Sequence, residues 1–159
     1  MTDRETDHKV ANLIPHLNSE RDVLRSFIAL LENEQQALLS QDSEQLLVLA
    51  EAKTQATNKL AELSNIRRRQ LNLNAANLDT SAWIQKNAPS CRAVWDEIRQ
   101  LAKRAHHLNQ TNGEVIQLKL RSNQQALTVL LGASQNAAGL YGRDGQPSLP
   151  IAGRTLGSG

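Results

Sequence analysis

Residues 90–131 read SCRAVWDEIRQLAKRAHHLNQTNGEVIQLKLRSNQQALTVLL, and the prediction of the fold rests mainly on this stretch. It contains no proline and one glycine, Gly113, and it is rich in Leu, Gln and Ala, which favour helices. In its first half, mostly apolar residues recur in steps of four and three and form a stripe. At about 100° per residue, the members of this stripe fall within about 40° of one direction. The stripe consists of Val94, Ile98, Leu101, Ala105, Leu108 and Asn112. The pattern predicts one helix that exceeds about 60 Å at about 1.5 Å per residue.

Two earlier helices are expected to provide the surface on which this helix packs. The first is predicted from residue 18 or 19 to residue 40, and the second over residues 43–71. Leucines recur every seven residues in the first, as in a coiled coil: Leu17, Leu24, Leu31 and Leu38. Asp42 can cap the second helix, and Gln45 can complete a capping box. Because the connection is short, the two helices should form an antiparallel hairpin.

The composition agrees with an all-α fold, an antiparallel helical hairpin plus a long third helix in a coiled-coil-like three-helix bundle. The chain has 159 residues, and only four are aromatic: Phe27, Trp83, Trp95 and Tyr141. So few aromatic residues argue against a β-sandwich or barrel core. A short helix that carries Trp83 is expected, with Asp79 or Thr80 as its N-terminal cap, and the long helix is expected to begin after Pro89.

The distribution of glycine and proline sets the expected boundaries. Pro15 marks the end of a polar segment, so residues 1–16 are predicted to be a flexible N-terminus. Seven of the eight glycines lie at or beyond Gly132, and each interior glycine costs a helix about 1 kcal/mol relative to alanine. We therefore expect an antiparallel α-helical domain over residues 17–131 and a flexible tail with Gly and Pro over residues 132–159.

Beyond Gly113 the apolar stripe splits into two rows. Val115, Leu118 and Val129 lie on one side of the helix, and the other row lies about 150° away. That second row consists of Ile116, Leu120, Leu127 and Leu131. Two rows require two partners. Three explanations stay open: a hairpin that covers both rows, self-association through one row, or a foreign partner helix held through anchors at i, i+4 and i+7.

Two residues at the point where the rows begin are expected to have structural roles. Asn112 occupies a position that the repeat assigns to the packing face, and a buried asparagine there would fix the register of the helices. Gly113 would allow another helix to approach closely. For both residues the alternative is a direct functional contact.

The sequence does not predict an enzyme, a cofactor site or a metal site. His106 and His107 are adjacent, so they point about 100° apart on a helix and do not chelate one metal ion. Cys91 has no histidine near it in sequence and is expected to be a small buried hydrophobe. The basic run 67–69 is expected to be a solvated helix end, with RNA binding as the alternative. No stretch is long and apolar enough for a signal peptide or a membrane span, which favours a soluble cytoplasmic protein.

Three segments together resemble the FlgN family of bacterial flagellar export chaperones. They are LNQTNG at residues 108–113, NQQALTVL at residues 123–130 and LYGRDGQ at residues 140–146. The hairpin, with ALLSQD at its turn and EAK at residues 51–53, is similar to the N-terminal half of that family. The resemblance covers most of the chain beyond about residue 15.

The resemblance implies a chaperone that binds the C-terminal helices of the hook–filament junction proteins FlgK and FlgL and delivers them to the export gate. The client-binding residues would be Val115, Ile116, Leu118, Leu120, Leu127, Leu130 and Leu131. The family's tail tyrosine is implicated in docking to the cytoplasmic domain of the gate protein FlhA. Because the segment LYGRDGQ matches, the resemblance assigns this role to Tyr141. The alternative function is a self-associating coiled-coil structural or regulatory protein, and the free chain could be a monomer or a weak dimer.

Overall fold

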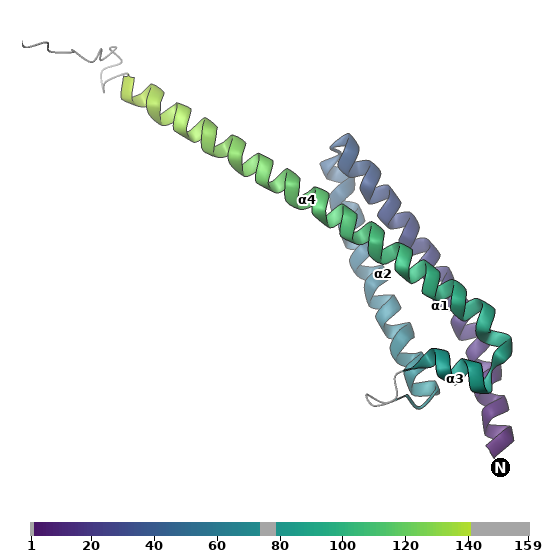
Figure 1. The fold of residues 1–159 in the computed structure, drawn as a ribbon. Coiled ribbons are helices and arrows are strands. Elements are labelled where there is room, and N and C mark those ends of the chain that lie inside the picture. The colour runs from purple at the N-terminus through teal and green to yellow at the C-terminus, as the bar shows by residue number, and fades with distance from the viewer. Residues whose placement is uncertain (1, 74–78, 141–159) are drawn as a thin grey trace, which may run out of the picture. The chain divides into compact units, whose positions relative to one another are not determined.

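The computed structural model describes residues 2–73 and 79–140, and every regular element in these ranges is a helix (Figure 1). The elements are α1 (Thr2–Ser40), α2 (Ser43–Gln70), α3 (Thr80–Asn87), the 3-10 turn η1 (Pro89–Cys91) and α4 (Arg92–Leu140). The predicted all-α class is confirmed. The packing of the chain divides it into two units after Ile116, and the two are described separately.

In the first unit α1 and α2 form the expected antiparallel hairpin (Figure 1). Contacts between them run in opposite order along the two helices. His16 Nε2 lies 2.8 Å from the Leu63 carbonyl oxygen near one end, and Lys53 Nζ lies 3.1 Å from the Glu34 carboxylate near the other. A late residue of α2 therefore faces an early residue of α1.

The turn of the hairpin satisfies the backbone groups that the two helix ends leave free. Gln41 has a φ of 58°, and the Asp42 amide donates to the Ala37 carbonyl at 3.0 Å, which closes α1 with a left-handed cap. Asp42 Oδ1 then accepts from the Gln45 amide at 3.0 Å, so the predicted cap of α2 is confirmed. Because the Asp42 amide is already bonded to Ala37, the second half of the capping box does not form.

The predicted start of the first helix is wrong. α1 begins at Thr2 and continues through Pro15, so the described part of residues 1–16 is helical. A proline inside a helix removes one backbone hydrogen bond and costs about 3 kcal/mol. Leu13 and Leu17, on either side of Pro15, are fully buried, and each such leucine contributes about 1.5–3 kcal/mol. Their burial offsets the cost of the proline, so Pro15 is not the helix boundary that the sequence predicts.

The hydrophobic core has two clusters of buried side chains. The first joins α1 to the end of α2, to α3 and to the start of α4, and it consists of Leu13, Leu17, Leu24, Leu71, Ile84, Ala88, Cys91 and Ile98. The second joins α1 to α4 and consists of Phe27, Ile28, Leu31 and Ala105. α3 is capped by Asp79, whose Oδ1 accepts from the Ala82 amide at 3.1 Å, so of the two predicted caps Asp79 is the one used.

The first half of α4 packs beside α1 and runs in the same direction. Arg25 pairs with Glu97, and Glu32 pairs with Arg104. Because the separation is 72 residues in both pairs, the two helices advance together in the same direction. The predicted stripe faces inward: Ile98, Ala105 and Asn112 are buried, and Val94, Leu101 and Leu108 are half-buried. The first half of α4 therefore packs against the hairpin with the face that its periodicity predicts.

Arg67 is buried, which corrects the expectation that residues 67–69 form a solvated helix end. Its guanidinium pairs with the buried carboxylate of Glu20 on α1 and lies 4.7 Å from the centre of the Trp95 ring on α4. It also donates to Ser64 Oγ at 3.2 Å. Arg68 and Arg69 are exposed. One arginine of the run therefore joins three helices instead of facing solvent.

The predicted end of the long helix is also wrong. α4 continues past Leu131 and through Gly132 to Leu140. Two glycines, Gly132 and Gly139, weaken this part of the helix, but its Leu, Gln and Ala content supports it. The predicted tail over residues 132–159 therefore begins with helix, and residues 141–159 lie outside the described part of the chain.

Candidate functional site

The second half of α4 carries a set of large apolar side chains that the described residues leave uncovered. They are 56–69% exposed: Leu118, Leu120, Leu127, Val129, Leu130 and Leu131. The two remaining predicted contact residues, Val115 and Ile116, are half-buried at the end of the first unit. Patches of exposed apolar side chains are uncommon on monomeric proteins and mark sites of interaction. We call the six exposed residues the distal apolar surface.

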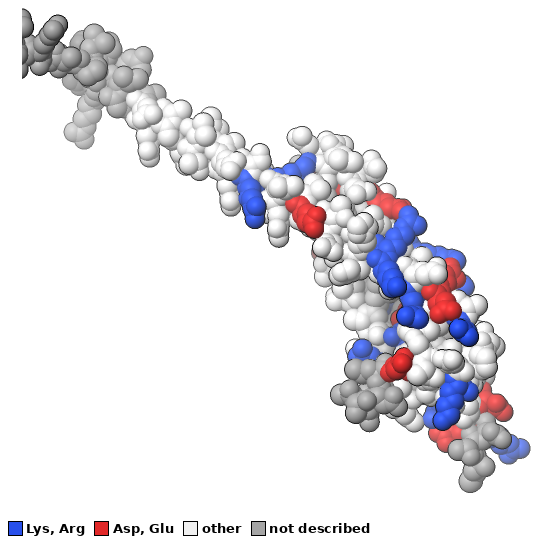
Figure 2. Space-filling model, in the orientation of Figure 1, with Lys and Arg blue, Asp and Glu red and all other residues white. Residues whose placement is uncertain are grey.

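The part of the distal apolar surface beyond Arg121 also lacks charge. After Arg121 no Asp, Glu, Lys or Arg occurs until Arg143. Figure 2 shows the same contrast, with red and blue side chains over the first unit and white ones along most of the second half of α4. A surface without charge attracts a partner through apolar contact, and long-range electrostatic attraction contributes little.

The second half of α4 has weak support within the chain. Its side chains from Arg121 to Leu131 are exposed, and the described hydrogen bonds there are local, such as Thr128 Oγ1 to the Gln124 carbonyl at 2.9 Å. Helices in water gain most of their stability from packing an amphipathic face. A partner that covers the leucines would therefore also stabilise this helix.

Asn112 is fully buried and joins three helices at the end of the first unit. Its Nδ2 donates to the Leu31 carbonyl at 2.8 Å and to Glu34 Oε2 at 2.9 Å. Lys53 of α2 donates to both oxygens of the same Glu34 carboxylate, each at 3.1 Å. A polar group that finds its partners in only one alignment of the helices favours that alignment, and the register role of Asn112 stays a prediction.

Gly113 does not have the close neighbour that we expected. A methyl group built at this position would have no other atom within 4 Å outside its own stretch of helix. No described residue of this chain therefore requires a glycine here. No helix of the described part of the chain makes the close approach to Gly113 that was expected.

Replacing Gly113 with alanine should therefore raise the free energy of unfolding by about 0.5–1 kcal/mol, because alanine restricts the unfolded chain and the new methyl group meets open space. Urea unfolding followed by circular dichroism measures the change. A loss of stability would mean that a neighbour does approach Gly113 in solution. Gly132→Ala, in the second half of the same helix and equally open, is the matched comparison.

The residues that could have supported chemistry do not converge. Cys91 is buried, as predicted, and burial raises the pKa of its thiol against the weaker opposing effect of a hydrogen bond with Ser90. His106 and His107 are exposed on α4. Among the described residues no group of three or more His, Cys, Asp or Glu side chains could hold a metal ion. Tyr141, the predicted gate-docking residue, lies outside the described residues.

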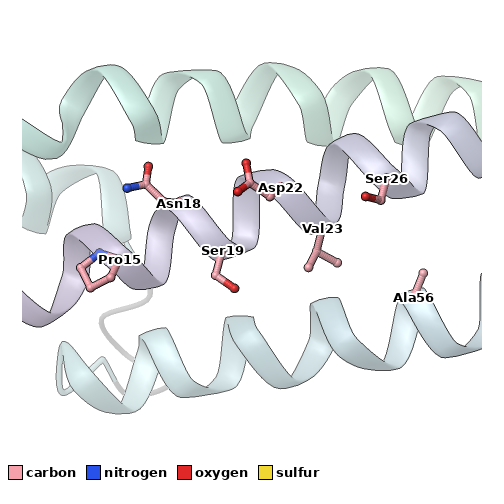
Figure 3. A pocket seen from close by; sticks show the side chains of 7 residues that line it. All are labelled: Pro15, Asn18, Ser19, Asp22, Val23, Ser26 and Ala56. Carbon is pink, nitrogen blue, oxygen red and sulfur yellow. The ribbon is translucent and has the colours of Figure 1, made fainter.

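A shallow groove runs along α1 on the side of α2 and has a volume of about 620 Å³. Figure 3 shows its lining: Pro15, Asn18, Ser19, Asp22, Val23 and Ser26 from α1, and Ala56 from α2. Asp22 is the single ionisable residue of this lining, and its carboxylate lies within 4 Å of the side chains of Arg21 and Arg25. The groove therefore presents no paired acid and base.

The turn between α1 and α2 carries a second exposed apolar set, which the sequence predictions did not include. Leu39, Leu47 and Val48 are exposed, whereas Leu38 and Leu49 beside them are buried. The signal was present in the sequence. In α2, Leu46 and Leu49 are three residues apart and therefore share the face that packs inward. Residues 47 and 48, between them, then point outward.

In a comparison with known protein families, the model of the family described as FlgN protein matches residues 1–148. No curated protein and no solved structure matches the chain. In the part of the chain that the structure describes, no helix has the length and apolar character needed to span a bilayer.

Proposed function

The chain belongs to the FlgN family of flagellar export chaperones, and we propose that it binds the C-terminal helices of hook-associated proteins of the FlgK and FlgL type. In this proposal the chain works in the cytoplasm, covers the apolar faces of these helices before export and delivers them to the type III export gate. The distal apolar surface of α4 is the binding site.

One observation supports this proposal above the others: large apolar side chains stand exposed on the second half of α4, which carries no charge after Arg121 and has little packing of its own. A helix that assembles through its apolar face aggregates or pairs too early if that face stays exposed in water. The distal surface offers such a helix a temporary partner. Leu120, Leu127 and Leu131, at i, i+7 and i+11 on one face of α4, are spaced to anchor it.

The joint replacement of Leu120 and Leu127 by aspartate should weaken client binding by a factor of about 100 or more. Each carboxylate would have to lose its water against an apolar client helix that offers no counter-charge. Because both leucines are more than half exposed, the fold should keep its stability. Titration calorimetry with a purified hook–filament junction protein measures the affinity, and thermal unfolding checks the fold.

Gln117→Asp with Thr128→Asp is the matched control, because both side chains are exposed and lie near the middle of the polar side of α4, between the two rows. These substitutions add the same two charges and should change the client affinity little. Equal loss of affinity in both double variants would point to a general effect of charge. Unchanged binding by the leucine variant would contradict the assignment of the distal surface.

Gate docking is proposed for Tyr141, on the strength of the LYGRDGQ segment. A tyrosine supplies a large contact area and one directional hydrogen bond at a small entropic cost. Tyr141→Ala should lower the affinity for the cytoplasmic domain of FlhA and leave client binding unchanged. Biolayer interferometry with each partner in turn measures both. If client binding falls to the same extent, the client and gate surfaces are not separate.

A further inference from the structure

Opposite sides of α4 face different helices in the first unit. Glu97 and Arg104 pair with Arg25 and Glu32, so their side of α4 faces α1. Trp95 lies under the guanidinium of Arg67, so its side of α4 faces α2. The buried stripe, which includes Ile98 and Ala105, lies between these two sides. The first half of α4 is therefore built to pack between two helices.

The two exposed apolar rows continue these two sides along the same helix. Leu118 follows Arg104 by two heptads, and Val129 lies about 20° from it on the helical wheel. Ile116 follows Trp95 by three heptads, and Leu120 and Leu127 share its face within about 40°. We call these the α1-side row (Leu118 and Val129) and the α2-side row (Leu120, Leu127 and Leu131). The charges that face α1 are thus replaced by apolar side chains further along α4.

One helix does not cover both rows. The rows point about 170° apart, and a helix packed on α4 covers an apolar stripe of about 100°. Exposed Leu130 lies between the rows, and the direction midway between them on its side of the helix lies within about 20° of the buried stripe of the first half of α4. The second half of α4 thus repeats the geometry of the first half, with room for one helix on each side.

From these relations we infer that the second half of α4 holds two helices of its client side by side, one on each row. The inference rests on the proposed function and adds the form of the client: a pair of neutral, apolar-faced helices that take the positions relative to α4 that α1 and α2 take in the first unit. Because residues 122–142 carry no charge, the partner faces need no matching charges, and affinity should depend weakly on salt.

A second copy of this chain fits the rows poorly. The α1 face that meets α4 presents Arg25 and Glu32, and against the leucines of the α1-side row these charges would lose their partners. Pairing of two α4 helices through one row would leave the other row of each exposed. A two-helix client covers both rows in a single complex.

Site-specific cross-linking tests this arrangement. Leu118→Cys and Leu127→Cys, one from each row, are made in a Cys91→Ala background, labelled with a benzophenone maleimide and mixed with the full-length purified junction protein. Thr128→Cys, on the polar side, is the control. After irradiation, mass spectrometry identifies the attached segment of the client. We expect the two row positions to label two client segments that are far apart in its sequence, and the control to label neither.

The other outcomes separate this inference from the proposed function. If both rows label one segment, or if only one row labels the client while the complex forms, the two-helix arrangement is overturned and the chaperone assignment stands. Cross-links between copies of the chain in place of the client would assign the rows to self-association and overturn the inference. If the unlabelled parent chain forms no complex with the client, the proposed function itself fails, and the inference fails with it.

Discussion

Replacing Arg67 with methionine is expected to lower the free energy of unfolding by about 3–5 kcal/mol. The Arg67 and Glu20 side chains are each 8% exposed and pair with each other between α2 and α1. Removing the arginine leaves the Glu20 carboxylate without its counter-charge in an apolar environment, and it also removes the cation–π contact with Trp95. The loss is measured by urea unfolding monitored by circular dichroism.

Two further variants show whether the loss comes from the unpaired charge. The double variant Glu20→Leu with Arg67→Met replaces the whole ion pair by apolar side chains and should recover most of the stability. Arg68→Met changes an exposed neighbour in the same run and should alter the stability by less than about 0.5 kcal/mol. A similar loss in the Arg67 and Arg68 variants would contradict a buried role for Arg67.

Asn112→Asp should destabilise the chain by about 3 kcal/mol near neutral pH. The Asn112 amide donates to two acceptors, the Leu31 carbonyl and the Glu34 carboxylate. A second carboxylate in its place has no proton to donate and repels both. The loss should shrink as the pH falls from about 7 to about 5, because like charges favour proton uptake in the folded state. Thermal unfolding across this pH range measures it.

Asn112→Leu is the matched control for the charge. It removes the amide and leaves the Glu34–Lys53 pair, so its effect on stability should be smaller and nearly independent of pH. If the aspartate variant is as stable as the wild type at neutral pH, Asn112 does not face Glu34 in solution. If both variants show the same pH dependence, the repulsion between carboxylates is not its cause.

Local rules predicted those parts of the fold that depend on neighbouring residues. Asp42 and Asp79 cap α2 and α3 because a side-chain oxygen followed by a free amide three residues later is a local feature. The stripe from Val94 to Asn112 faces inward because the helical period fixes its direction. The exposure of Leu120 and Leu127 agrees with the split of the stripe, which one hairpin does not cover.

Features that depend on distant residues were not predictable in the same way. Pro15 reads as a helix boundary, but Leu13 and Leu17 pack against distant parts of the chain and hold the helix across it. Arg67 reads as one of three equal arginines, and its partner Glu20 lies 47 residues away. The open space around Gly113 likewise depends on how the helices lie, which a single sequence does not reveal.

Hydrogen exchange of the free chain and of its complex with a purified junction protein is the most direct test of the client-binding surface. In the free chain, amides of residues 117–136 should exchange quickly, because this part of α4 has little packing to protect it. Client binding should slow their exchange by a factor of at least about 10, while the α1–α2 hairpin changes little. Unchanged exchange over residues 117–136 in a formed complex, with protection at Leu39, Leu47 and Val48 instead, would contradict the account.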